Sequence, residues 1–391
     1  MALQPASGAK DLNPKQVEKN HLLSNKLSEV FRLWGYEEVS PPRVERLGTL
    51  MAGGAIKNED IVKLVADEPL GLRPEMTASI ARAACTRLSQ RQRPLRLWAS
   101  GTVFERRESI ESGLKIEENL QCGVELIGVG GIKGEMELLS ILLDSMEKLN
   151  LSDQCKPTLL IGHTSLMDLV LSDVEDTKKE RIRSYLVSFD RLSLERDDIT
   201  SELKDTLINL QECRGHPLKV LNILERIFGK SELLSNLKRL FLMIEPIAKK
   251  DGVELQLDPT FEPHFELYTG IVLQLICKSI SAPVVIARGG RYDDLVKHFG
   301  CEDRNAKGLG FGFAIDKIRE LQIESEFNEI SGKKLIVAYG KERQLEDAIE
   351  RQKYWHKKGY VAEVQLESVE SESEAIELSK KRGCTSIDWL E

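Results

Sequence analysis

The chain has 391 residues, of which 41% are apolar and 30% are charged, and its formal net charge is −8. This composition is typical of a globular protein with a sizeable core, and no apolar run reaches the roughly 18 residues of a membrane-spanning helix. The acidic balance disfavours a nucleic-acid partner, because proteins that bind nucleic acids usually carry a basic face for the phosphates.

The first half of the chain predicts a mixture of helices and strands. Apolar residues at helical spacing, with Gly35 as a stop signal, predict the first helix. Short runs of β-forming residues between turn residues predict strands, and the polar stretch 105–119 predicts a long mobile loop. The predicted elements are a helix at 15–34, a strand at 36–39, a hairpin of 61–65 with 71–73, a helix from 77 to about 88, antiparallel strands at 96–104 and 123–128, and a helix at 134–149.

The second half of the chain changes character twice. Residues 151–255 are rich in Leu, Lys and Glu at helical spacing, which predicts a helical insertion at about 165–250. After Ser331, strands alternate with helices, as in a small α/β domain. The remaining predicted elements are strands at 158–161, 253–257, 265–276, 283–287 and 308–314, a helix from 315, a strand at 335–339, a helix at 342–356, a strand at 360–364, a helix at 372–381 and a strand at 385–389.

Cysteine and histidine spacing indicates neither a disulfide framework nor a metal site. The seven cysteines form no CxxC pair, and the six histidines show no HExxH or HxH spacing. The N-terminus also lacks the apolar segment of a secretory signal. We therefore expect a cytoplasmic protein with reduced thiols, no metal site and no cofactor.

Four sequence blocks carry a resemblance to a known family. They read LWGYEEVSPPRVE at 33–45, GLRPEMT at 71–77, IARGGRYDDLV at 286–296 and GLGFGFAIDKI at 308–318. In this order they resemble the catalytic core of histidyl-tRNA synthetase, a class II aminoacyl-tRNA synthetase. The resemblance covers roughly residues 5–150 and 255–320 and implies an α+β fold, with the antiparallel sheet of class II synthetases flanked by helices.

The resemblance also divides the chain. It implies a synthetase-like catalytic-core domain over residues 1–320, with the helical insertion at about 165–250 inside it. Residues 331–391 then form a small α/β domain that resembles a truncated anticodon-binding domain.

The resemblance implies a histidine-binding pocket. In the family, a carboxylate of the RPExT block binds the α-ammonium, and that residue is Glu75 here. The matching glutamine and glutamate are Gln121 and Glu125, and the two tyrosines are Tyr268 and Tyr292. Carboxylates pair with an ammonium through charge-assisted hydrogen bonds, and tyrosine hydroxyls with a carboxylate can fix an imidazole tautomer. The alternative is that these are core residues inherited with the fold.

The family's ATP-binding arginines have no counterparts in this chain. The arginine on the α-phosphate corresponds to Glu105, a histidine-specific arginine corresponds to Pro263, and a third arginine corresponds to Lys317. Activation of an amino acid requires fixed cations around the phosphates, whereas a carboxylate repels them and lysine lacks the planar fork of arginine. We therefore predict no catalytic residue, and we interpret His264 as a non-catalytic histidine.

A histidine site without an adenylation site resembles the synthetase paralogues that serve as regulatory subunits of ATP phosphoribosyltransferase. This resemblance implies a chain that is not an enzyme, a short-form ATP phosphoribosyltransferase catalytic subunit that requires it for activity, and L-histidine as feedback effector in the first step of histidine biosynthesis. It also implies a homodimer core within a hetero-oligomer, with neither tRNA nor a membrane as partner. Two alternatives remain, a divergent active histidyl-tRNA synthetase and a synthetase-like binding module.

Overall fold

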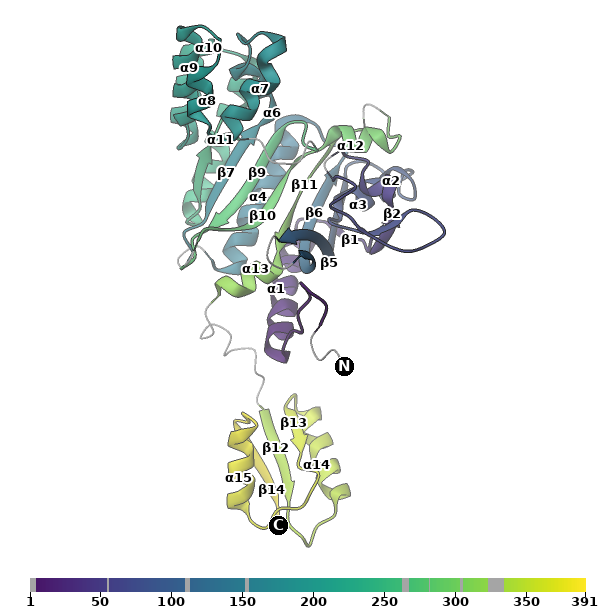
Figure 1. The fold of residues 1–391 in the computed structure, drawn as a ribbon. Coiled ribbons are helices and arrows are strands. Elements are labelled where there is room, and N and C mark those ends of the chain that lie inside the picture. The colour runs from purple at the N-terminus through teal and green to yellow at the C-terminus, as the bar shows by residue number, and fades with distance from the viewer. Residues whose placement is uncertain are drawn as a thin grey trace. The chain divides into compact units, whose positions relative to one another are not determined.

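Helix α1 (Pro14–Leu33) is the first element of the computed structural model (Figure 1). It begins at a capping box, in which the Gln16 amide donates to the Asn13 side chain at 3.0 Å and the Asn13 amide donates to the Gln16 side chain at 2.9 Å. Its apolar face, with Leu27 and Phe31 fully buried, packs against helix α4 (Gly131–Leu149). The cap and this face place the helix where the sequence predicts it.

The structure describes residues 5–54, 56–109, 113–151, 155–261, 267–280, 282–302, 305–322 and 334–391. The chain consists of two compact units, Met1–Leu321 and Gln322–Glu391. Over the described ranges, no helix is long and apolar enough to cross a membrane.

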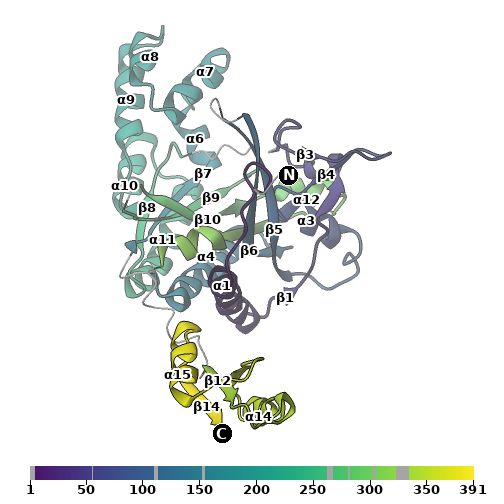
Figure 2. The same ribbon diagram turned by 60° about the horizontal axis from the view of Figure 1, so that its bottom comes forward.

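An eight-stranded sheet forms the centre of the first unit (Figures 1 and 2). In spatial order its strands are β1 (Glu37–Glu38), β5 (Leu95–Ser109), β6 (Gly113–Ile127), β11 (Gly308–Ala314), β10 (Val284–Arg291), β9 (Ile271–Cys277), β7 (Thr158–His163) and β8 (Glu254–Leu257). Neighbouring strands are antiparallel except at the two edges, where β1 pairs parallel with β5 and β8 parallel with β7. Two of the four sequence blocks therefore lie on adjacent strands, β10 and β11, beside β6.

The two faces of this sheet are covered by different helices. Helices α1 and α4 pack on one face, where the even-numbered positions of β6 between 122 and 126 enter the larger apolar core. Helices α3 (Thr77–Cys85) and α12 (Asp293–His298) cover part of the other face in a smaller apolar cluster. Because side chains alternate along a strand, Gln121 and Glu125 face this second side.

The other elements of the first unit extend from this sheet. A small antiparallel sheet, in the order β2–β4–β3, consists of β2 (Val44–Arg46), β3 (Val62–Lys63) and β4 (Leu70–Leu72). The remaining helices are α2 (Leu47–Leu50), α6 (Thr164–Val170), α7 (Asp176–Val187), α8 (Arg191–Arg196), α9 (Ser201–Glu212), α10 (Pro217–Phe228), α11 (Glu232–Lys250) and α13 (Ile315–Leu321). Helices α6 to α11 follow one another without a strand of the large sheet between them, from residue 164 to residue 250.

The second unit is a three-stranded parallel sheet with two helices. Its strands are ordered β13–β12–β14, and the apolar residues of β12 are buried. The elements are β12 (Lys334–Tyr339), α14 (Leu345–Lys357), β13 (Val361–Val364), α15 (Glu372–Lys381) and β14 (Ser386–Leu390). The predicted alternation of strands and helices in this part of the chain is confirmed.

The loop predicted at 105–119 is wrong. Strands β5 and β6 continue as a paired ribbon, with Glu105 opposite Glu117 and the last pair between residues 109 and 113. The Arg107 guanidinium bridges Glu117 at 3.1 Å across the strands and Glu105 at 2.9 Å along its own strand. From 104 to 107 and from 113 to 120 the described side chains are half-buried or exposed and none is fully buried, so the sequence lacks the apolar alternation of a strand. Cross-strand ion pairs support the pairing instead.

Three predicted boundaries also differ from the structure. The strand expected at 265–276 begins only at Ile271, while 262–266, with Pro263 and His264, lie outside the described residues. Helix α3 ends at Cys85 and not at 88. Strand β10 continues past 287 to Arg291 through two glycines, which are generally unfavourable in strands but here pair with β11.

Candidate functional site

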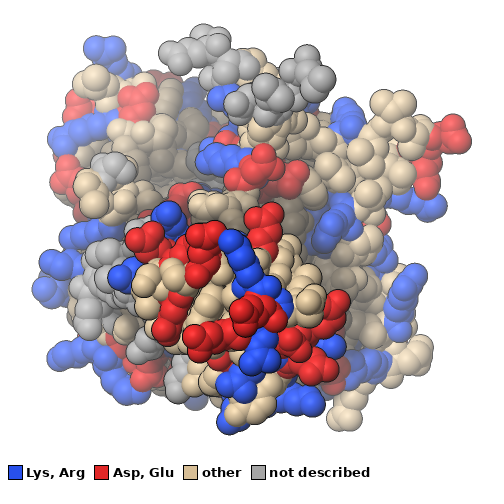
Figure 3. Space-filling model, turned by 90° about the horizontal axis from the view of Figure 1, so that it is seen from below, with Lys and Arg blue, Asp and Glu red and all other residues tan. Residues whose placement is uncertain are grey.

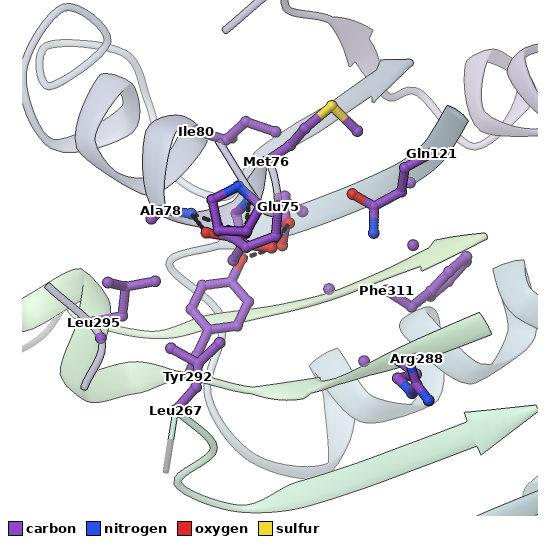
Figure 4. A pocket seen from close by; sticks show the side chains of 18 of the residues that line it. Glu75, Met76, Ala78, Ile80, Gln121, Leu267, Arg288, Tyr292, Leu295 and Phe311 are labelled. Carbon is purple, nitrogen blue, oxygen red and sulfur yellow. Dashed lines mark hydrogen bonds between the residues drawn. The ribbon is translucent and has the colours of Figure 1, made fainter. Parts of the chain in front are cut away.

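A pocket lies on the α3 side of the large sheet, over strands β6, β11 and β10 (Figure 4). It encloses about 1000 Å³ of space, including the part that is open to solvent, which is of the order expected for a small-molecule site. Its lining includes all five residues that the sequence suggests for histidine: Glu75, Gln121, Glu125, Tyr268 and Tyr292. The fold therefore brings these residues together from separate parts of the chain.

Two glycines of β11 make room for the polar side chains of β6. Gly310 lies opposite Glu125, and a Cβ atom at this position would overlap the Glu125 carboxylate and the Val124 carbonyl. A Cβ atom at Gly312 would lie 2.5 Å from the side-chain amide of Gln121. The GLGFGF block thus serves the pocket by leaving space for Glu125 and Gln121 to cross the neighbouring strand.

Glu125 is the centre of the hydrogen-bond network in the pocket. Its carboxylate accepts from the Thr77 hydroxyl at 2.7 Å and from the Tyr292 hydroxyl, and the whole residue is only 5% exposed. The pKa of Glu125 is raised to about 8, because burial and, to a smaller extent, the nearby Glu75 carboxylate outweigh the two hydroxyls, which lower it. Glu125 is therefore protonated in much of the free protein at neutral pH.

Glu75 lies at the N-terminus of helix α3. Its carboxylate accepts from the backbone amides of Thr77 and, at 3.0 Å, Ala78, and the positive end of the helix dipole adds to this stabilisation. Burial raises the pKa of Glu75 above its ordinary value, and these hydrogen bonds oppose that change. Glu75 and Glu125 are linked through Thr77, which donates to both.

The two tyrosines differ in what they contact. Tyr292, labelled in Figure 4, is buried, and its hydroxyl donates to Glu125. Tyr268 is only partly buried, and within the described parts of the chain its hydroxyl has no hydrogen-bond partner. Burial, together with the charges of Glu125 and Glu75, raises the pKa of both tyrosines, so both remain protonated near neutral pH. The Tyr268 hydroxyl is thus available for a ligand.

Of the three residues that the resemblance matches to ATP-binding arginines, Glu105 and Lys317 belong to the described part of the chain. Glu105 lines the pocket, beside the Arg107 guanidinium that it binds. Lys317, on α13, is not among the lining residues, and burial followed by the charge of Arg288 lowers its pKa. The structure therefore places a carboxylate of β5 in the pocket, whereas Pro263 lies outside the described residues.

Sequence reasoning missed two polar residues of the pocket. Thr77 belongs to the GLRPEMT block and Arg288 to the IARGGRYDDLV block, yet neither was assigned a role. Arg288 lies four residues before Tyr292 on β10, so the two-residue period of a strand could have placed both on one face. Among the described residues, no group of three or more histidine, cysteine, aspartate or glutamate side chains could hold a metal ion.

Comparison with known proteins relates the chain to two groups. The family model of histidyl-tRNA synthetase matches residues 8–318. The ATP phosphoribosyltransferase regulatory subunit of Prochlorococcus marinus (strain MIT 9303) is 57% identical over 391 residues, which is 100% of both chains, and that of Synechococcus sp. (strain CC9902) is 54% identical over the same length. The chain belongs to the family of ATP phosphoribosyltransferase regulatory subunits. This family membership confirms the predicted relationship and favours a non-catalytic role over a divergent active synthetase.

Solved structures confirm the α+β fold for this member of the regulatory-subunit family. A Bacillus halodurans C protein, described as an ATP phosphoribosyltransferase regulatory subunit/histidyl-tRNA synthetase, superposes with a TM-score of 0.83 at 24% identity, over 100% of this chain and 98% of that one. The histidyl-tRNA synthetase of Nostoc sp. PCC 7120 has a TM-score of 0.78 at 18% identity, over 98% and 90% of the two chains. The fold of the regulatory subunit is thus that of the synthetase.

Proposed function

We propose that this chain is the regulatory subunit of an ATP phosphoribosyltransferase, which assembles with a short-form catalytic subunit and is required for its activity. The observation that carries this proposal is the identity of 57% along the whole length of a protein of that name. The chain would then act in the first step of histidine biosynthesis, in the cytoplasm, as a homodimer core within a hetero-oligomer.

L-histidine is the proposed effector, bound in the pocket over β6, β11 and β10. The Glu75 carboxylate is suited to the α-ammonium, while Glu125, with the Tyr268 and Tyr292 hydroxyls, is suited to the imidazole. Gln121 lies at the other end of the same strand face and offers an amide to the ligand. These roles account for buried carboxyls that are costly to hold in an apolar environment.

Neither tRNA nor another nucleic acid is proposed as a partner. On the face that Figure 3 shows, lysine and arginine side chains lie interspersed with aspartate and glutamate side chains. Residues 331–391 carry eleven Lys and Arg against twelve Asp and Glu. A surface that binds tRNA through its phosphates would be expected to concentrate positive charge.

Mixing the purified chain with a short-form catalytic subunit is expected to raise the turnover of that subunit, and added L-histidine is expected to lower it again. Histidine must bind the active and inhibited states of the complex unequally, and such couplings are typically about 5- to 150-fold. Turnover measured against histidine concentration, with and without the chain, tests both effects. No activation on mixing would refute the regulatory role, and activation without inhibition would leave a role in assembly alone.

The affinity for L-histidine is expected to increase by about fivefold between pH 7 and pH 8, because Glu125 must lose its proton to accept from the ligand and its pKa is about 8. Below this pKa, Glu125 carries a proton in the free protein, and binding of L-histidine must release that proton. Above this pKa, the affinity no longer depends on pH. Calorimetric titrations at several pH values measure the slope. Glu125→Gln has no proton to release, so its affinity for L-histidine should not change with pH. An equal dependence of affinity on pH in both proteins would assign the effect to another group.

A further inference from the structure

The charges of the pocket are divided between its two ends. In Figure 4, Glu75 and Tyr292 lie at one end of the pocket, whereas Gln121 and Arg288 lie toward the other. Glu125 belongs to the first end, because it accepts from the Tyr292 hydroxyl. Among the described residues that line the pocket, Arg288 is the only one with a cationic side chain. Glu105 also lines the pocket, but its carboxylate is bound by the Arg107 guanidinium. The unpaired guanidinium of Arg288 and the buried carboxyls of Glu75 and Glu125 therefore match a ligand that carries both charges, such as an amino-acid zwitterion.

The sheet register explains why Arg288 reaches this end. Arg288 and Gly290 occupy alternate positions on β10, and Tyr292 follows directly after the strand. Arg288 and Tyr292 both line the pocket, so their side chains lie on the same side of the sheet. Gly290 pairs with Gly310, which lies opposite Glu125, and Arg288 pairs with Gly312, over which the Gln121 side chain lies. The two levels are two residues apart, about 7 Å along the strand, a separation that a small amino acid can bridge.

The guanidinium of Arg288 has no partner among the residues that the structure describes. The residue is exposed, and it forms no hydrogen bond or ion pair with any described residue. The other arginine nearby, Arg107, is held between Glu105 and Glu117. Arg288 therefore offers a planar fork of donors at the pocket, and this geometry suits a carboxylate.

We propose that Arg288, with Gln121 beside it, forms the subsite for the α-carboxylate of the amino-acid ligand. This inference rests on the proposed function, because it concerns the same ligand in the same pocket. Of the five residues predicted from the sequence, Glu75, Glu125 and the two tyrosines account for the ammonium and the imidazole. Gln121 is then left for the carboxylate, and Arg288 adds the positive charge that the five residues lack. It also makes the pocket selective for the intact amino acid over amines that share its side chain.

The charges around Tyr268 are consistent with this arrangement. The Glu125 and Glu75 carboxylates raise the pKa of Tyr268, after burial, whereas the Arg288 guanidinium lowers it. The hydroxyl of Tyr268 thus lies close enough to the two carboxyls and to the guanidinium to be affected by the charges of both. A ligand bound beside Tyr268 would meet carboxylates on one side and the guanidinium on the other.

Two analogues of L-histidine test the contribution of its carboxylate to binding. Histamine has the imidazole and an ammonium but no carboxylate, and histidine methyl ester has a neutral ester in its place. Titration calorimetry on the wild-type chain is expected to show that L-histidine binds about tenfold or more tightly than either analogue, the difference that one charge-assisted pair supports.

Replacement of the arginine supplies the second half of the test. Arg288→Leu is expected to lower the affinity for L-histidine by about tenfold or more and to leave the affinity for histamine unchanged. The two ligands should then bind with similar affinity. Arg288→Lys keeps the charge but not the planar fork, so its affinity for L-histidine should lie between those of the wild type and Arg288→Leu. Because Arg288 is exposed and unpaired, the thermal unfolding midpoint should not change in either variant. Arg226→Leu, an exposed arginine of α10 outside the pocket, is the matched control.

The possible outcomes distinguish this subsite from the proposed function. If the wild type binds L-histidine and Arg288→Leu binds it equally well, the subsite is refuted while the histidine pocket stands. Equal losses of affinity for L-histidine and histamine in Arg288→Leu would also refute the subsite, because a contact with the carboxylate cannot affect a ligand that has no carboxylate. Absence of L-histidine binding by the wild type would refute the proposed effector and this subsite together.

Discussion

Incubation of the chain with L-histidine, ATP and Mg²⁺ is expected to yield no histidyl-adenylate above background. Transfer of the adenylyl group concentrates negative charge at the α-phosphorus, and fixed cations must meet it. The resemblance matches the family's phosphate-binding arginine to Glu105, which lines the pocket, and the second arginine to Pro263. Loss of one such donor typically lowers a rate by about 10²–10³-fold, so two losses should remove roughly 10⁴-fold or more.

Histidine-dependent exchange of pyrophosphate into ATP measures this reaction, with an active histidyl-tRNA synthetase as the positive control. The same preparation must bind L-histidine by calorimetry, so that an inactive or unfolded sample is not mistaken for a chain that cannot adenylate. Histidine-dependent exchange above background would contradict the prediction, because it would require that another cation, such as Arg107, leaves Glu105 and Glu117 to meet the phosphate.

The parts of the fold that the sequence predicts well are those with buried faces. Helix α1 has a capping box and an apolar face, and both act locally, so its bounds follow from residues 13–33 alone. The β5–β6 ribbon has no buried face, so its pairing depends on register and on ion pairs such as that of Arg107 with Glu117. Contacts of this kind are formed between strands and leave no period in the sequence of either one.

In the candidate site too, some residues could be predicted from the sequence, whereas others depend on contacts between strands. The five predicted residues came from a resemblance to a family, and the structure places all of them around one pocket. Arg288 carries no signal of its own, because an exposed arginine in a strand is ordinary on the evidence of one sequence. Its significance depends on Gly312 and Gln121 on neighbouring strands, and thus on a register that only the folded sheet provides.

Glu125→Ala and Tyr268→Phe are expected to uncouple histidine from the assembled enzyme while leaving activation of the catalytic subunit intact. Each change removes one polar partner of the ligand and leaves the other partner unpaired in the pocket, which costs roughly 1–3 kcal/mol or about 5- to 150-fold in affinity. Glu125→Ala also frees the hydroxyls of Thr77 and Tyr292, so its effect should be the larger. The apolar cores around the pocket are unchanged, and both variants should fold.

The measurement is turnover of the mixed subunits against histidine concentration, with half-maximal inhibition as the quantity compared. Tyr36→Phe is the matched control, because it removes a buried tyrosine hydroxyl that donates to a carboxylate, Glu137 at 3.1 Å, without lining the pocket. If inhibition in Glu125→Ala and Tyr268→Phe equals that of the wild type, histidine binds elsewhere and the buried carboxyls belong to the inherited core. If Tyr36→Phe weakens inhibition as much as they do, the effect comes from loss of packing. Only a loss confined to the pocket variants, with activation preserved, assigns histidine sensing to this pocket, because activation requires the assembled fold whereas inhibition also requires the ligand contacts.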